Sequence, residues 1–226
     1  MSRSVIVTGG FGVLGQAVAQ AFAAAGDQVA RIDFVPAAHS PLPGALDIGG
    51  VDLTDAAATQ TALDKVASAH GGIDVLVNVA GGFVWETLKD GTIATWAKMQ
   101  AMNLLSNATI TQLALPQLKQ SDAGRIVSLG AGAALKAGAG MGAYAASKSG
   151  VHRLTEALAE ELAGSSVTVN AILPSIIDTP TNRADMPDAD TSTWVSPAAV
   201  ADVILFLASP AARSISGALI PVTRGG

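Results

Sequence analysis

Short apolar runs alternate with longer amphipathic stretches from one end of the chain to the other. The short runs are rich in Val, Ile and Leu, as buried strands are. The longer stretches repeat apolar residues every three or four positions, which favours helices with one buried face. We expect strands at residues 4–8, 28–33, 45–48, 73–78, 124–129, 166–172 and 217–222, and helices at residues 13–25, 55–69, 92–119, 143–163 and 197–208.

This alternation predicts the fold class. We predict an α/β protein of the Rossmann type, a doubly wound, seven-stranded parallel sheet with helices on both faces. A length of 226 residues suits one dinucleotide-binding and catalytic domain spanning residues 1–226. Residues 174–197 are the longest segment without clear periodicity, and they follow a strand end, where open α/β sheets place their ligands. We therefore expect residues 174–197 to form a substrate lid.

Composition and charge exclude several classes of partner. A net charge of −5 and a pI near 5.0, with no basic stripe, argue against nucleic acid. The chain has no cysteine, which excludes a disulfide framework, a thiol nucleophile and a Cys-ligated metal. The chain enters its first strand almost at once and has no apolar run of membrane-spanning length. We therefore expect no secretory signal, no membrane partner and a cytoplasmic location.

A glycine cluster links the first predicted strand to the first predicted helix. Gly10, Gly12 and Gly15 match G-x-G-x-x-G in the strand–turn–helix setting typical of dinucleotide binding. These glycines permit a tight turn and a close approach to a pyrophosphate, which the helix N-terminus attracts. The next strand ends at Asp33, about where a carboxylate bonding the adenosine ribose is expected.

Asp33 also suggests which nicotinamide cofactor is bound. Its carboxylate would repel the 2′-phosphate of NADPH, and the next residue is Phe34 rather than a compensating Arg. Arg31 is a nearby cation that could weaken the discrimination. We expect NADH to be preferred, with NADPH possible.

Tyr144 is the only tyrosine of the chain, and it lies four residues before Lys148 on a predicted helix. This spacing places both side chains on one helix face. A free phenol has a pKa of about 10, and a nearby cation favours the phenolate. We therefore expect Lys148 to lower the pKa of Tyr144 and to make it a general acid or base.

The three histidines show no spacing typical of metal ligands. Because His39, His70 and His152 are scattered, we expect no metal site. His152 lies two turns beyond Tyr144, and we expect it in solvent or at a subunit contact.

With the glycine turn and the Tyr/Lys pair in place, the whole chain resembles the short-chain dehydrogenase/reductase family. Asn78-Val79-Ala80-Gly81 resembles the family's N-N-A-G element, and Asp52 resembles its adenine-contacting aspartate. Asn103 matches the helix asparagine that supports a proton path to the Lys. The resemblance implies Tyr144, Lys148 and Asn103 as catalytic residues. The implied cofactor-binding residues are Gly9, Gly10, Phe11, Gly12, Val13, Leu14, Asp33, Asp52, Leu53, Asn78, Ala80, Gly81, Pro174, Ile177 and Thr179.

Two departures from the family pattern indicate altered chemistry. The family's active-site Ser lies thirteen residues before the Tyr, where this chain has Ala131, and Val13 replaces a common glycine of the turn. Ser128 lies on the preceding strand and does not substitute for the Ser by register. The dihydropteridine reductase branch shares both departures, and residues 173–194 resemble its substrate-side loop.

The resemblance implies an NAD(P)H-dependent oxidoreductase acting on a small molecule. The favoured substrate is a quinonoid dihydropterin-like ring, with Tyr144 as proton donor. The alternatives are a ketone or 3-oxoacyl reductase and a non-catalytic dinucleotide-sensing protein. The family's helix packing implies a homodimer or homotetramer. Four further residues are expected to line a flat substrate pocket, namely Phe83, Trp85, Met141 and Trp194.

Overall fold

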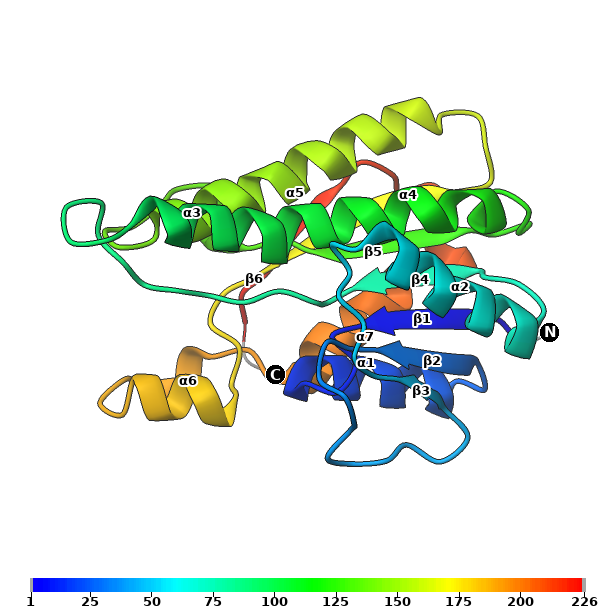
Figure 1. Ribbon diagram of the computed structural model, residues 1–226, viewed down its shortest axis with the longest axis horizontal. Helices are drawn as coiled ribbons and strands as arrows, with labels where there is room; N and C mark the ends of the chain where they lie inside the picture. Colours follow the sequence, from blue (N-terminus) through cyan, green and yellow to red (C-terminus); the bar gives the residue numbers. More distant parts are fainter. Residues whose placement is uncertain (1, 225–226) are drawn as a thin grey trace.

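One seven-stranded sheet forms the centre of the molecule, as the computed structural model shows for residues 2–224 (Figure 1). All neighbouring strands are parallel, in the order β3-β2-β1-β4-β5-β6-β7. The fold prediction is therefore confirmed; residues 1, 225 and 226 of the domain expected over residues 1–226 lie outside the described residues. The strands are β1 Ser4–Thr8, β2 Gln28–Ile32, β3 Leu46–Ile48, β4 Val75–Asn78, β5 Arg125–Leu129, β6 Thr168–Pro174 and β7 Leu219–Val222.

The strand order reverses between β1 and β4. The chain goes from β1 outward to β2 and β3, then returns to pair β4 on the other side of β1. Every residue of β1 and of β4 is buried. A reversal of this kind leaves a crevice outside the carboxyl ends of the two strands, which is where ligands of open α/β sheets bind.

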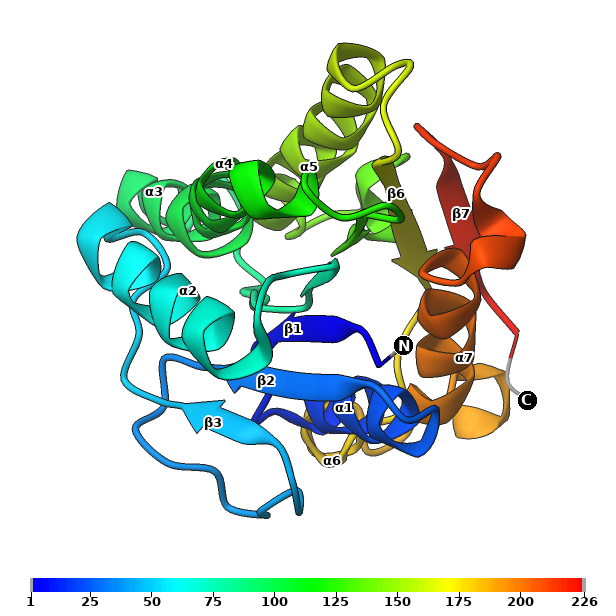
Figure 2. The ribbon, with the colours of Figure 1, turned by 90° about the vertical axis from the view of Figure 1, so that its right-hand side faces the viewer.

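Helices cover both faces of the sheet (Figure 2). The helices α1 and α7 pack together on one face, where Val18, Phe22 and Ile204 belong to one apolar core. The helices α2, α4 and α5 cover the other face, with a second core that includes Leu63 and Ile110. The helices are α1 Val13–Ala24, α2 Ala56–His70, α3 Ile93–Met99, α4 Ser106–Leu118, α5 Gly142–Glu161, α6 Pro180–Asp185 and α7 Pro197–Leu207.

The expected helix over residues 92–119 is not continuous. A π-helical turn, η1 Gln100–Leu105, separates α3 from α4. Asn103 lies in this turn and is fully buried, bonded to groups on two other segments. Such π turns insert an extra residue into a helix and often occur at functional sites. The hydrophobic pattern could not reveal the turn, because it depends on distant polar partners.

The expected lid over residues 174–197 is ordered. It contains α6 and the short 3₁₀ turn η3 Thr191–Thr193. Its two ends meet in a bridge between Ile177 and Val195. The segment is therefore a folded loop whose two ends are paired with each other. Its role as a lid stays a proposal.

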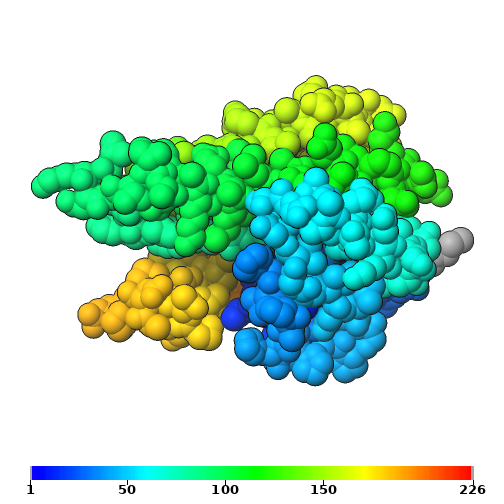
Figure 3. All heavy atoms as spheres, in the orientation of Figure 1, coloured from blue at the N-terminus to red at the C-terminus, as the bar shows by residue number. Residues whose placement is uncertain are grey.

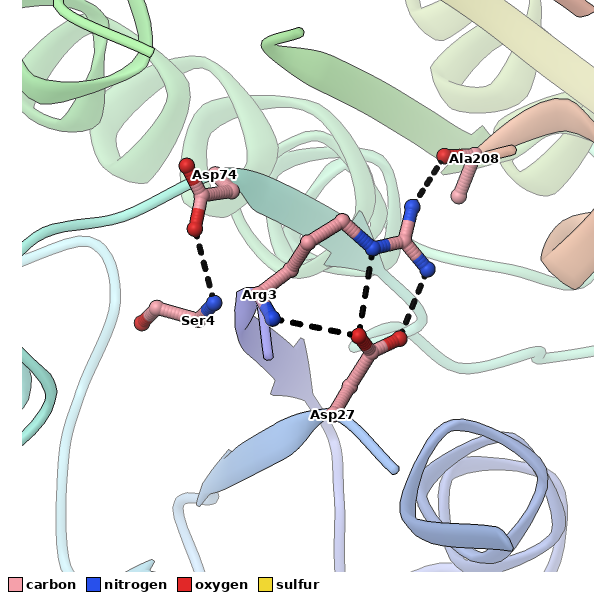
Figure 4. A network of polar contacts seen from close by, with 5 residues as sticks. All are labelled: Arg3, Ser4, Asp27, Asp74 and Ala208. Carbon is pink, nitrogen blue, oxygen red and sulfur yellow. Dashed lines mark hydrogen bonds and ion pairs between the residues drawn. The ribbon is translucent and has the colours of Figure 1, made fainter. Parts of the chain in front are cut away.

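A polar network joins the elements at the opposite end of the sheet (Figure 4). The Arg3 guanidinium bonds both oxygens of Asp27 and also donates to the Ala208 carbonyl after α7. The Ser4 N–H donates to Asp74 at 2.8 Å. These contacts tie β1 to the start of β2, the approach to β4 and the end of α7, away from the crevice.

No helix within residues 2–224 is long and apolar enough to cross a membrane.

Candidate active site

A cavity of about 860 Å³ lies at the carboxyl ends of the strands. The green residues of α3, the orange residues of α6 and the blue loops after β1 and β2 surround this part of the surface (Figure 3). Fifteen of the residues singled out from the sequence line it: Gly9, Phe11, Gly12, Val13, Leu14, Asp33, Asp52, Leu53, Ala80, Gly81, Phe83, Tyr144, Lys148, Ile177 and Thr179.

The glycine turn makes the floor of one end of the cavity. Gly9 has a φ of +62°, and a Cβ there would lie 2.9 Å from the Ala80 backbone. A Cβ on Gly15 would lie 2.1 Å from the Gly9 carbonyl oxygen, so only glycine lets α1 start this close to β1. No side chain caps α1 at Gly12, which leaves the first N–H groups of the helix available to an anion.

Gly10 does not line the cavity. A Cβ at this position would lie 2.6 Å from Arg31 Cβ and 2.9 Å from the Val7 carbonyl oxygen. A glycine is therefore needed at position 10 because the turn packs closely on β2. Gly10 differs in this respect from Gly9 and Gly12, which face the cavity.

Asp33 lies beside the glycine turn with its carboxylate held by backbone. Oδ2 accepts from the Phe11 N–H at 2.9 Å, and Oδ1 accepts from the Val35 N–H at 3.0 Å. These bonds fix the carboxylate at the cavity wall and leave each oxygen a further lone pair for a ligand hydroxyl.

Arg31 is fully buried beneath this end of the site. It forms a bidentate ion pair with Asp47, with distances of 2.7 Å and 2.6 Å. Its guanidinium also lies 5.3 Å from the centre of the Phe11 ring. Both carboxylate oxygens of Asp47 therefore bind Arg31, the cation that lies two residues before Asp33 in the sequence.

Asp52 stands farther along the same end. Its Oδ1 accepts from the side chain and the backbone N–H of Thr54, and these two bonds lower the pKa of the carboxyl. Asp52 is therefore charged at neutral pH. Neighbouring wall residues that the sequence reasoning did not assign to the cofactor or substrate site include Phe34, Val35, His39, Val51 and Thr54.

Tyr144 and Lys148 lie on α5 and both face the other end of the cavity. Burial raises the pKa of Tyr144 to about 12 and lowers the pKa of Lys148 to about 8. The expectation that Lys148 would lower the phenol pKa is therefore wrong, because desolvation of the phenolate dominates. Tyr144 is a neutral phenol at neutral pH, and it can act as a proton donor.

Two contacts hold the Tyr/Lys pair, and a glycine leaves room beside it. The Lys148 ammonium donates to the Leu129 carbonyl at 2.7 Å. The Phe83 ring meets the Tyr144 ring edge-on, with centroids 4.9 Å apart. A Cβ on Gly81 would lie 3.3 Å from Lys148 Nζ, so a glycine here keeps the approach to the ammonium open.

Asn103 lies behind the cavity wall rather than in it. Its side chain exchanges two hydrogen bonds with the Gly82 backbone, at 2.9 Å and 3.0 Å. It also donates to Ser147 Oγ at 2.9 Å, and Ser147 Oγ in turn donates to the Tyr144 carbonyl. The residue therefore links η1, the segment after β4 and α5.

Asn78 and Pro174 also lie outside the cavity wall. Asn78 ends β4, and its amide donates to Asn107 and Thr111 of α4. Pro174 ends β6 and is buried. Both act through the placement of neighbouring backbone.

Three of the four expected pocket residues do not line the cavity, and Phe83 is the exception. Trp85 is 61% exposed and packs over Gly140, where a Cβ would lie 2.1 Å from its ring. Trp194 is itself part of the lid segment and is buried, and Met141 precedes the first turn of α5. A residue's position in a loop above the sheet did not reveal which way its side chain points.

The other lid residues mainly fold the lid. Asp178 and Arg183 form a bidentate ion pair at 2.6 Å and 2.8 Å. Thr179 caps α6, and the Asn182 amide donates to the Ile177 carbonyl. Much of the motif that resembles a substrate-side loop therefore has a structural explanation.

One face of the η1 region also lines the cavity. Lys98, Met102 and Ser106 are spaced four apart and face it together. Helical spacing before and after Asn103 was the sequence signal that could have identified them.

Position 131 has no side-chain donor. Ala131 is buried, and its N–H donates to Nε2 of His152 at 3.3 Å. His152 is only 2% exposed, so its expected position in solvent or at a subunit contact is wrong. Ser128 is buried within β5, between Asn78 and Ala171 on the neighbouring strands, and it does not line the cavity.

Comparison with known proteins gives the same assignment as this geometry. The family model for short chain dehydrogenases matches residues 3–190. The chain belongs to the short-chain dehydrogenase/reductase family. It is an NAD(P)-dependent oxidoreductase of that family, which confirms the coarse functional expectation.

Individual relatives match along nearly the whole chain. The 3-oxoacyl-[acyl-carrier-protein] reductase MabA of Mycobacterium tuberculosis is 35% identical over 100% of this chain and 93% of its own length. The D-threitol dehydrogenase of Mycolicibacterium smegmatis is 32% identical, with 99% and 92% covered. A short chain dehydrogenase from Burkholderia cenocepacia, solved in complex with NADP, superposes with a TM-score of 0.90 at 33% identity, covering 99% of this chain and 97% of its own.

The residues present fit a nicotinamide dinucleotide. A side chain at Gly9 or Gly15 would fill the glycine turn, the start of α1 is uncapped, and Asp33 is fixed as an acceptor. Within residues 2–224 no three His, Cys, Asp or Glu side chains gather in a way that could hold a metal ion.

Proposed function

We propose that this enzyme uses NADH to reduce a small, activated carbonyl compound, with Tyr144 as the proton donor. The observation that carries the proposal is the neutral phenol of Tyr144, whose pKa is raised to about 12 by burial, beside Lys148 in the wall of the cavity. Reduction of a carbonyl needs a proton at its oxygen, and a positioned neutral acid provides it.

The chain's own residues have separate tasks in this reaction. When bound, the nicotinamide ring supplies the hydride. Asp33 and the start of α1 hold the ribose and the phosphates at one end. Phe83 packs on the Tyr144 ring and limits its rotation. Lys148, tied to the Leu129 carbonyl, shares the cavity wall with Tyr144, and its positive charge offsets part of the cost that burial adds to losing the phenol proton during the reaction.

Ala131 restricts the substrate to carbonyls that are already polarised. The methyl group donates no hydrogen bond, and the N–H of the same residue is bonded to His152. Removing one positioned donor from a reacting oxygen costs about 10²-fold or more in rate. A carbonyl next to an electron-withdrawing group depends less on such a donor.

The names of the relatives support carbonyl chemistry. MabA is named as a 3-oxoacyl-[acyl-carrier-protein] reductase, and a second relative is named as a D-threitol dehydrogenase. The alternative named from the sequence, a ketone or 3-oxoacyl reductase, is therefore the better supported class.

A quinonoid dihydropterin-like ring is the second candidate substrate. Ala131 favours it, because such a ring is reduced at nitrogen and has no carbonyl oxygen that needs a second donor. The lid motif adds less support, since the Asp178–Arg183 pair, Thr179 and Asn182 are engaged in folding the lid.

The preference for NADH rests on Asp33 and Arg31 together. The Asp33 carboxylate would lie near a 2′-phosphate and repel it. Arg31, which could have compensated, is fully buried and paired with Asp47. We also retain the homodimer or homotetramer and the cytoplasmic location as predictions.

A spectrophotometric screen tests the proposed function. Oxidation of NADH is followed with activated carbonyls, simple ketones and quinonoid dihydropterin, each repeated with NADPH. We expect turnover with activated carbonyls. Turnover confined to the dihydropterin would select the second candidate, and equal use of simple ketones would contradict the argument from Ala131.

A further inference from the structure

His152 shares a helix face with the proposed catalytic pair. Tyr144, Lys148 and His152 are spaced four residues apart on α5, so their side chains lie in one row. His152 is 2% exposed and does not line the cavity. The proposed reaction assigns it no part.

The row holds the chain where it leaves β5. Lys148 donates to the Leu129 carbonyl at 2.7 Å, and His152 accepts from the Ala131 N–H at 3.3 Å. Between these two, the Gly130 N–H donates to the Ile172 carbonyl of β6 at 2.9 Å. Leu129, Gly130 and Ala131 are thus each hydrogen-bonded to α5 or β6. Ala131 is the position at which the family has its active-site Ser.

The space at Gly130 is matched to the imidazole. A Cβ at Gly130 would lie 2.6 Å from His152 Nε2, so only glycine leaves room for the ring. Because Nε2 accepts a hydrogen bond, it carries no proton, and the neutral ring has its proton on Nδ1. A protonated imidazole has no acceptor to offer to the Ala131 N–H.

We propose that neutral His152 is a positioning residue that anchors the backbone at Ala131 and so fixes the end of β5, whose Leu129 lines the cavity together with Tyr144. The catalytic consequence rests on the proposed function, whereas the anchoring itself does not. Protonation of the ring releases the Ala131 N–H and lowers turnover.

The charges around His152 act in one main direction. Burial lowers its pKa most, Arg153 and Lys148 lower it further, and Glu156 opposes them. These three charged groups lie on α5 itself, and the segments packed against the ring contribute backbone at Gly130 and Ala131. The anchor is therefore present at neutral pH and is lost as pH falls through the lowered pKa.

Turnover as a function of pH tests the proposal. His152→Leu removes the acceptor and should lower kcat about tenfold with NADH affinity kept, as expected for a misplaced wall. His152→Gln retains an uncharged acceptor and should recover most of this loss. Because the His152 pKa is lowered, the wild type should keep its activity at the ordinary His pKa of about 6.5 and lose it at a lower pH. His152→Gln should show no such loss.

His70 provides the matched control. Burial also lowers its pKa, but it contacts Ser4 at the opposite end of the sheet. His70→Gln should therefore keep the acid loss of activity. An acid loss that is the same in wild type and His152→Gln, or a normal kcat in His152→Leu, would overturn the proposal.

Amide hydrogen exchange at Ala131, read by NMR, needs no substrate and separates the anchor from the proposed function. Exchange should be slow in wild type and His152→Gln, and at least about tenfold faster in His152→Leu, where the N–H loses its acceptor. Protection that is equal in all three proteins would exclude the anchor, even if the enzyme reduces carbonyls as proposed.

Discussion

The two ends of the cavity use different physical means to prepare for a ligand. At the Asp33 end, which we propose for the adenosine, backbone N–H groups hold the carboxylate in place at the cavity wall. At the Tyr144 end, burial changes the ionisation of the side chains themselves. It raises the pKa of Tyr144 to about 12 and lowers the pKa of Lys148 to about 8. The first end is prepared by geometry and the second by desolvation.

This difference shows how much of each end depends on nearby sequence. The Asp33 carboxylate is held by Phe11 and Val35, which lie in the loops after β1 and β2. The state of Tyr144 depends on Phe83 and on the packing of η1 and the β5 exit against α5. The residues of both motifs line the cavity, but the motif of Tyr144 did not predict the ionisation of its phenol.

The largest expected effect comes from removing the phenol. Tyr144→Phe keeps the ring and its contact with Phe83 but loses the proton donor, so kcat should fall by about 10²-fold or more. NADH binding, measured by fluorescence titration, should stay within about twofold because the adenosine end is untouched. A near-normal kcat would mean that Tyr144 is structural.

Restoring the hydroxyl at position 131 should have the next largest effect. Ala131→Ser restores a hydroxyl at the family's Ser position, two residues after Leu129 of the cavity wall, and reduction of simple ketones should rise by up to about 10²-fold. Ala133→Ser, two residues away, is the matched control and should leave the rates unchanged. If neither variant improves ketone reduction while dihydropterin turnover is high, the dihydropterin candidate gains.

The adenosine end should respond through cofactor choice rather than rate. We expect kcat/KM to favour NADH over NADPH by at least about tenfold, or roughly 1.4 kcal/mol. Asp33→Asn removes the charge that repels a 2′-phosphate and should reduce this ratio. Asp52→Asn removes a neighbouring carboxylate and should leave the ratio unchanged; a wild type that prefers NADPH would refute the assignment.

The lid should show the smallest effect. Arg183→Ala breaks the ion pair with Asp178, which lies in solvent and is therefore weak. We expect KM for the substrate to rise by about threefold while kcat and the melting temperature stay near wild type. A fall in kcat together with the rise in KM would mean that Arg183 acts on the reacting groups, which its position in the structure does not indicate.

The sequence predicted the fold because each of its signals is local. Apolar runs and helical repeats identified all seven strands and most helices, and the alternation led to the parallel order. It did not predict η1, since that turn is stabilised by bonds from Asn103 to Gly82 and Ser147, residues 21 and 44 positions away. It also did not predict the folded lid, whose ends pair through Ile177 and Val195.

The sequence by itself determined the glycine turn, Asp33 and the Tyr144/Lys148 pair, because each depends on spacing within one or two adjacent elements. Only the tertiary structure decided the protonation of Tyr144, the burial of His152 against Ala131 and the pairing of Arg31 with Asp47. These properties depend on which groups surround a side chain and how much water reaches it. Folding sets both by bringing together elements that are far apart along the chain.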